Sequence, residues 1–255
     1  MKKSIYLTVI WIITIFCIII GSGYRFMGWG QDFFEHFETG TSRSEKINNQ
    51  KTLDEFHNIS FDIDLSEVTI EVGSSYDISY HCTKNQVVEY KVENDTLIVT
   101  ETSKNPHFPK RNGNDNCDIV ITVPRDAQLS KVSGSCDLGD VELSGFIAEK
   151  VDISCDLGAA SVLDVTASSI VCECNLGSCE IEDCVFDDLT VNNDLGNVDL
   201  SGNGILSDYT LDLQVSLGSI EVNDDVYSSQ YRRDGDSDKN IKITCNMGSI
   251  VIDDD

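Results

Sequence analysis

The chain has 255 residues, and its 44 acidic residues outnumber 18 basic ones, so its formal net charge is −26. A field this negative repels nucleic acid and anionic lipid headgroups, which excludes a nucleic-acid-binding protein. It favours cations or basic proteins as partners, although the acids can also simply keep a long β surface soluble.

The first predicted element is a transmembrane helix over Ser4–Ile20. This stretch reads SIYLTVIWIITIFCIII and follows Lys2 and Lys3. With Gly21–Gly23 it reaches about 20 residues, the length that crosses a hydrocarbon core. The lysines predict that residues 1–23 form a cytoplasmic stub and anchor, with everything after them outside. A cleaved signal peptide is the alternative, but its apolar core would be shorter. The predicted location is therefore the cell membrane, with a single pass.

Residues 24–51 are predicted to form a juxtamembrane tether, aromatic at first and polar afterwards. From residue 52 the chain alternates Val, Ile, Tyr and Thr with polar residues, which predicts half-buried strands. These runs cover 61–72, 76–82, 87–92, 96–102 and 117–124. Asn94-Asp95 and Asn112-Gly113 mark turns. We expect residues 52–128 to be an irregular N-terminal part of the repeat architecture that follows.

One phrase recurs six times in residues 129–255. It reads SCDLGDVEL (135–143), SCDLGAASV (154–162), ECNLGSCEI (173–181), NNDLGNVDL (192–200), VSLGSIEV (215–222) and TCNMGSIVI (244–252). The central apolar residues of the first four phrases are evenly spaced, and the last two intervals are longer. A fixed period of roughly 20 residues is typical of a solenoid. The predicted fold class is all-β: a parallel β-solenoid with coils of about 19 residues, preceded by one N-terminal transmembrane helix.

Aligning the phrases places apolar residues in columns six before, two before and five after the central residue. Period-2 alternation predicts that these columns face inward. The glycine after each central residue permits a sharp bend, and we expect the central residue to plug the corner from inside. Asp64-Leu65-Ser66 looks like a weaker copy, so the earlier strands should share the architecture. The structural turn residues are Leu138, Gly139, Leu157, Gly158, Leu176, Gly177, Leu195, Gly196, Leu217, Gly218, Met247 and Gly248.

The strand runs, the segment ITVPRDAQLSKVSGSCDLGDVEL and the repeated D/N-L-G phrases resemble the bacterial "putative adhesin" family of unknown function, which includes LiaG-like proteins. The resemblance covers residues 52–252. It implies a solenoid-like β fold on the cell envelope behind an N-terminal membrane anchor, in some members with a link to envelope-stress responses. It implies no catalytic residues.

The cysteines of the chain, ten in all, allow three interpretations. Cys136, Cys155 and Cys174 lie one period apart, close enough for disulfides. A second group within one coil could bind zinc, although its spacing lacks the paired C-x2-C pattern. The interpretation that we favour is cysteine as a small core filler, in columns shared with valine and isoleucine. The weak metal candidates are Cys172, Cys174, Cys179 and Cys184.

The acids and the histidines bear on calcium and catalysis. Stacked turn carboxylates could coordinate Ca²⁺, but the phrase does not match the G-G-x-G-x-D calcium repeat, so solvated acids are favoured. No cofactor is predicted. The repeats contain no histidine for a Ser-His or Cys-His pair, so the chain is predicted not to be an enzyme.

The longest interval between phrases, from Leu217 to Met247, clearly exceeds the regular period. The excess falls in residues 225–240, which combine tyrosines with an Arg-Arg pair on an otherwise acidic domain. A loop leaving a rigid scaffold is a common binding element, and the alternative is a solvated loop whose arginines pair with local aspartates. The candidate binding residues are Tyr227, Tyr231, Arg232 and Arg233.

The predicted function is that of a non-catalytic cell-envelope protein presenting an acidic extracytoplasmic solenoid for binding or adhesion, to a protein or a cell-wall glycan. The alternative is the ectodomain of an envelope-stress sensing or regulatory system that acts through a partner membrane protein. A glycan-processing enzyme ranks third.

Overall fold

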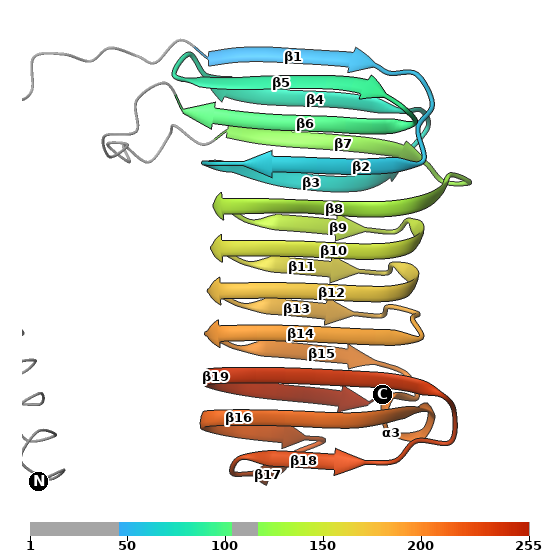
Figure 1. The fold of residues 1–255 in the computed structure, drawn as a ribbon, viewed down its shortest axis with the longest axis vertical. Coiled ribbons are helices and arrows are strands. Elements are labelled where there is room, and N and C mark those ends of the chain that lie inside the picture. Colours follow the sequence, from blue (N-terminus) through green and yellow to red (C-terminus); the bar gives the residue numbers. More distant parts are fainter. Residues whose placement is uncertain (1–45, 104–116, 255) are drawn as a thin grey trace, which may run out of the picture. The chain divides into compact units, whose positions relative to one another are not determined.

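The computed structural model describes residues 46–103 and 117–254, which form β-strands and a single-turn helix, α3 (Ile205–Asp208) (Figure 1). Four regular coils fill the middle of the stack, and each has one strand before the corner glycine and one after it. The coils are β8 (Gln128–Leu138) with β9 (Val141–Ser144), β10 (Ile147–Leu157) with β11 (Ala160–Leu163), β12 (Thr166–Leu176) with β13 (Cys179–Glu182), and β14 (Asp188–Leu195) with β15 (Val198–Gly202).

Neighbouring coils pair in parallel at the predicted period. Val151 lies opposite Val132 on one side and Ile170 on the other, each one period away along the chain. The first strands of the coils build one wall and the second strands build the other, with the core between them. The three predicted inward columns are buried, which confirms the predicted coils. These columns hold Val132, Val151, Ile170, Leu189, Leu211 and Ile241; Cys136, Cys155, Cys174, Asn193, Val215 and Cys245; and Leu143, Val162, Ile181, Leu200, Val222 and Ile252.

At the C-terminal end the coils do not stack in chain order. The last strand, β19 (Lys239–Asp254), lies between the β14–β15 coil and β16 (Tyr209–Val222) (Figure 1). Met247 therefore pairs with both Leu195 and Leu217. The long excursion forms β17 (Asp225–Tyr227) and β18 (Gln230–Arg233), which run antiparallel to β16 and cover its outer edge.

The N-terminal end is built in a similar way. The coil of β2 (Asn58–Ile63) and β3 (Ser66–Gly73) lies between the β8–β9 coil and the strands β6 (Thr96–Ser103) and β7 (Cys117–Pro124). Ile63 pairs with Cys136, which confirms the weaker copy at residues 64–66. Antiparallel strands cover this end: β5 (Gln86–Glu93) on β6, β4 (Asp77–Thr83) on β7, and β1 (Lys46–Thr52) on β4. Antiparallel cover at both ends protects edges that would otherwise pair with other chains.

The predicted fold class is wrong in two respects. Antiparallel pairs at both ends make the sheet mixed, so the solenoid is not purely parallel. The transmembrane helix over Ser4–Ile20 is not supported: across 46–103 and 117–254, no helix combines the length and the apolar character needed to cross a membrane, and Ser4–Ile20 lies outside these ranges. In addition, β1 begins at Lys46, inside the segment predicted to be a tether.

The corner glycines are required by contact between coils. At Gly177 the backbone φ is 155°, and a Cβ added there would overlap the carbonyl oxygen of Gly158 in the next coil. Gly196 meets Gly177 in the same way. Because the overlapped atoms belong to backbone, no side-chain rotation could make room, and glycine recurs in each of the six phrases.

Candidate functional site

The corner of the coils presents a continuous row of exposed apolar side chains. The central residues of the six phrases lie in register, one per coil, and their exposed fractions run from 38% for Leu138 to 63% for Leu217. The prediction that they plug the corner from inside is therefore wrong. We call this row the corner ridge; it consists of Leu138, Leu157, Leu176, Leu195, Met247 and Leu217.

The outward direction of these residues follows from the bend of the chain. In the β10–β11 coil, Cys155 before the bend and Ala160 after it are both buried, and they fill the inside of the corner. Leu157 and Gly158 lie on the convex side between them. Hydrophobic character alone does not bury a residue, because much of a protein's surface is apolar. What distinguishes the corner ridge is that its apolar residues are contiguous.

Carboxylates flank the corner ridge on the side of the first wall. Asp137, Asp156 and Asp194 are exposed, each next to a ridge residue. Burial and the nearby Asp156, Asp64 and Asp62 raise the pKa of Asp137. Asparagines relieve part of this repulsion: Asn175 donates to Asp156 over 2.7 Å, and Asn246 donates to Asp194 over 2.7 Å.

A second set of acids follows the corner ridge on the other wall. Asp140 and Glu142 stand two and four residues after Leu138, and Glu180 lies opposite Asp199 between neighbouring coils. Burial and the charges of Glu180 and Asp253 raise the pKa of Asp199. The corner is thus an apolar strip between two rows of negative charge.

The predicted binding loop returns along β16 as β17 and β18, and two of the four candidate residues are partly buried. Tyr227 and Tyr231 pack against the core with ring centroids 4.7 Å apart. The guanidinium of Arg232 donates to both carboxylate oxygens of Asp212, over 3.0 and 3.4 Å. Arg233 is exposed. This ion pair agrees with the alternative of arginines paired locally, and a binding role for the four residues stays a prediction.

The four weak metal candidates lie close together in sequence but differ in environment. Cys172, Cys174 and Cys179 are buried, whereas Cys184 is partly exposed. Within the described ranges no group of three or more histidine, cysteine or acidic side chains has the geometry to hold a metal ion. Burial raises the pKa of Cys136 to about 12, and a hydrogen bond with Cys174 together with burial raises the pKa of Cys155. Hydrogen bonds with Cys155 and Cys179 lower the pKa of Cys174.

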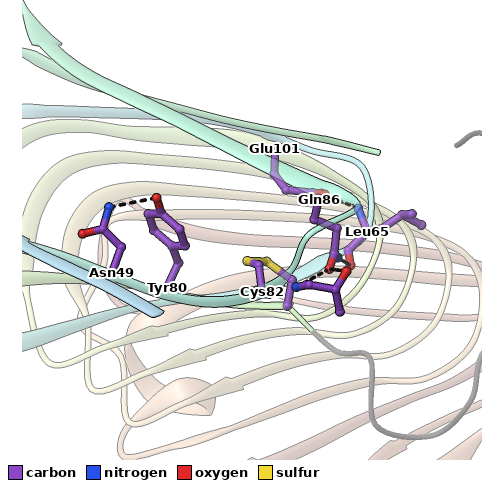
Figure 2. Close-up of a disulfide and its surroundings, with 8 residues drawn as sticks. Asn49, Leu65, Tyr80, Cys82, Gln86 and Glu101 are labelled. Atoms are coloured by element: carbon purple, nitrogen blue, oxygen red, sulfur yellow. Dashed lines mark hydrogen bonds between the residues drawn. A yellow bond between two sulfur atoms is a disulfide. The ribbon is translucent and has the colours of Figure 1, made fainter. Parts of the chain in front are cut away.

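One pair of cysteines departs from the core-filler interpretation. Cys82 and Cys117 form a disulfide between β4 and β7 (Figure 2). The antiparallel pairing that places His81 opposite Asp118 brings these two cysteines together one step further on. The sequence could not predict this pair, because neither cysteine belongs to the regular repeat. The seven other described cysteines are free thiols.

The family model described as Toastrack DUF4097 matches residues 56–253. The chain belongs to the Toastrack family. This match confirms the resemblance noted from the strand runs and D/N-L-G phrases.

Solved structures give a likeness of fold. The Toastrack chain is similar to a "putative cell adhesion protein" from Clostridium sporogenes, with 10% identity and a TM-score of 0.55, over 83% of this chain and 100% of that one. It is also similar to a "putative adhesin" from Bacteroides fragilis, with 15% identity and a TM-score of 0.41, over 83% and 97% of the two chains. The first likeness shows the fold alone. No curated protein matches this chain in sequence.

Two further features of the Toastrack domain were not predicted from the sequence. Glu101 is fully buried near the disulfide, where its Oε2 accepts a hydrogen bond from Leu65 N–H over 2.8 Å, and among the described residues its Oε1 has no hydrogen-bond partner (Figure 2). The alternation Leu97, Val99, Glu101 along β6 already places this acid on the inward face, so the signal was present. The second feature is an open groove of about 500 Å³ across β1, β4 and β7, whose lining includes Val120, Tyr80 and Asn49; the Nδ2 of Asn49 donates to Tyr80 Oη over 2.9 Å.

Proposed function

We propose that this Toastrack protein is a non-catalytic protein of the cell envelope that acts by binding or adhesion. The observation that carries the proposal is the corner ridge, where each of the six phrases adds one exposed apolar side chain and most of them add carboxylates beside it. A repeated surface of this kind suits recognition of an extended partner better than chemistry on one small molecule.

The cysteines support a location of the protein outside the cytoplasm. The disulfide between Cys82 and Cys117 is the kind of bond that persists in oxidising compartments. The free thiols other than Cys184 are enclosed in the core, out of reach of a substrate, which supports a non-catalytic role. The cell-adhesion description of the Clostridium sporogenes protein points in the same direction, as an expectation for this chain.

The acidic surface suggests what holds the protein to its target. A net charge of −26 favours basic groups on a protein or a glycan partner, and attraction between exposed charges weakens as salt screens it. Binding through this surface should therefore be strong at low ionic strength and weaker at high ionic strength.

The experiment measures retention of the full chain on washed bacterial envelope fractions at several salt concentrations, with release of soluble sugar followed in parallel. The proposal predicts saturable retention that falls as salt increases, without release of sugar. Absence of retention at every salt concentration, or catalytic release of sugar, would overturn it.

A further inference from the structure

The corner ridge is an unusual feature for the surface of a soluble domain. Six large apolar side chains lie on six neighbouring coils without a polar residue between them in the stack. Each of them is between 38% and 63% exposed, although the buried columns on either side are closed to solvent. Contiguous exposed apolar strips of this kind mark interaction sites on proteins more often than scattered apolar residues do.

The charges around the corner ridge restrict what can cover it. No lysine or arginine stands from two residues before to five after the ridge residue in any of the six phrases, whereas carboxylates stand on both sides. A second copy of this chain would bring acidic rows face to face, and an anionic lipid surface would meet the same repulsion. The occupant that complements the corner carries an apolar stripe bordered by basic residues.

The spacing along the corner ridge favours a helix as this occupant. Neighbouring coils lie about 4.8 Å apart, so six ridge residues extend over roughly 25 Å. An α-helix presents an apolar side chain about every 5.4 Å along one face, and about 18 residues cover that length. Alternate side chains of an extended strand lie about 7 Å apart, so they match the spacing of the ridge residues less well than those of a helix.

We propose that the corner ridge is the docking surface for a basic amphipathic helix of a partner protein. The helix lies along the stack, its apolar stripe contacts the corner ridge, and its lysines or arginines face the acidic rows that include Asp137, Asp156 and Asp199. This proposal rests on the proposed binding function and specifies the partner's chemistry.

The test measures binding of a dye-labelled synthetic helix of about 18 residues, with leucine on one face and lysine elsewhere, to the full chain by fluorescence anisotropy. A second peptide keeps the leucines and replaces each lysine with glutamate. The ridge variant is Leu157→Ser with Leu176→Ser. Its control is Ile147→Ser with Val185→Ser, which removes two comparably exposed apolar residues at the opposite corner.

The acidic rows are tested by a second matched pair of variants. Asp137→Asn with Asp156→Asn removes two charges beside the corner ridge, and Asp164→Asn with Asp183→Asn removes two exposed charges away from it. Asparagine is compatible with the positive φ of Asp164 and Asp183. These variants keep the test decisive if the serine variants fold poorly.

We expect the lysine peptide to bind the wild type, about tenfold weaker binding to the ridge variant, weaker binding to the Asp137 and Asp156 variant, and little change in either control. The glutamate peptide should not bind. Equal affinity across each matched pair would overturn the proposal, as would dimerisation of the chain or binding to phosphatidylglycerol vesicles through the corner ridge. If the peptide fails while envelope fractions still retain the protein, the docking proposal fails and the proposed binding function stands.

Discussion

At the scale of single residues, the corner glycines test the stacking of the coils. We expect Gly177→Ala to destabilise the fold by about 3 kcal/mol, because its Cβ would overlap the Gly158 carbonyl oxygen and the backbone would have to shift. The measurement is the free energy of unfolding in urea.

Gly204 provides the control for this substitution. It also has a positive φ, 76°, but a Cβ there would meet no atom closer than 3.5 Å. Gly204→Ala should therefore cost only the backbone strain, about 1 kcal/mol. Equal losses for the two alanine variants would mean that the glycines do not contact each other across coils.

The direction of the corner leucines is a second test at this scale. Leu157 is 44% exposed, so Leu157→Asp should fold, with a loss of about 1 kcal/mol. Val162, in the same coil, is 1% exposed, and Val162→Asp should cost about 4 kcal/mol or more because it buries an unpaired charge. Thermal melting of both variants checks the assignment, and an unfolded Leu157→Asp would place Leu157 in the core after all.

At the scale of elements, the buried acid of β6 makes stability depend on pH. Burial raises the pKa of Glu101, and the hydrogen bond from Leu65 N–H opposes this shift only in part. The folded state therefore holds the proton more tightly than the unfolded state does. The stability that Glu101 provides is fully present below its unfolded pKa, and it is lost as the pH rises through the folded pKa.

We predict that Glu101→Gln raises the free energy of unfolding at pH 7. Its advantage over the wild type should disappear as the pH falls below the pKa of an ordinary glutamate. Glutamine keeps the acceptor for Leu65 N–H. Glu89→Gln, an exposed change on β5, controls for the general loss of negative charge. A difference between Glu101→Gln and wild type that is constant from pH 4 to pH 7 would contradict the prediction.

The pairing of β4 with β7 at the N-terminal end leads to a prediction about which cysteines are oxidised. In a denatured, non-reduced sample, the seven free cysteines of residues 46–103 and 117–254 should react with an alkylating reagent, while Cys82 and Cys117 should react only after reduction. Mass spectrometry of the alkylated peptides provides the measurement. Reduction should also cost about 3 kcal/mol of stability, because the bond closes a long loop. A disulfide among Cys136, Cys155 and Cys174 would contradict the core-filler interpretation and support the alternative of disulfides between coils.

At the scale of the whole molecule, the regular spacing of the phrases predicted the coils and their inward columns, because parallel pairing repeats one residue pattern on each coil. It did not predict that β19 inserts between the β14–β15 coil and β16, since an interval in sequence does not say which coil is the neighbour in space. Alternation also could not tell that Leu157 faces outward, because the bend at Gly158 interrupts it. The sequence also did not predict that the excursion covers the edge of β16, because this too depends on the order in which the coils stack in space.

Retention on envelope fractions tests whether the protein binds its target through the corner ridge. The full chain, the Leu157→Ser/Leu176→Ser variant and the Ile147→Ser/Val185→Ser control are compared at one low salt concentration, with melting temperatures measured alongside. We predict that the ridge variant keeps a melting temperature close to that of its control but loses most of its retention, while the control is retained like the wild type. Equal retention of all three proteins would contradict binding through the corner ridge.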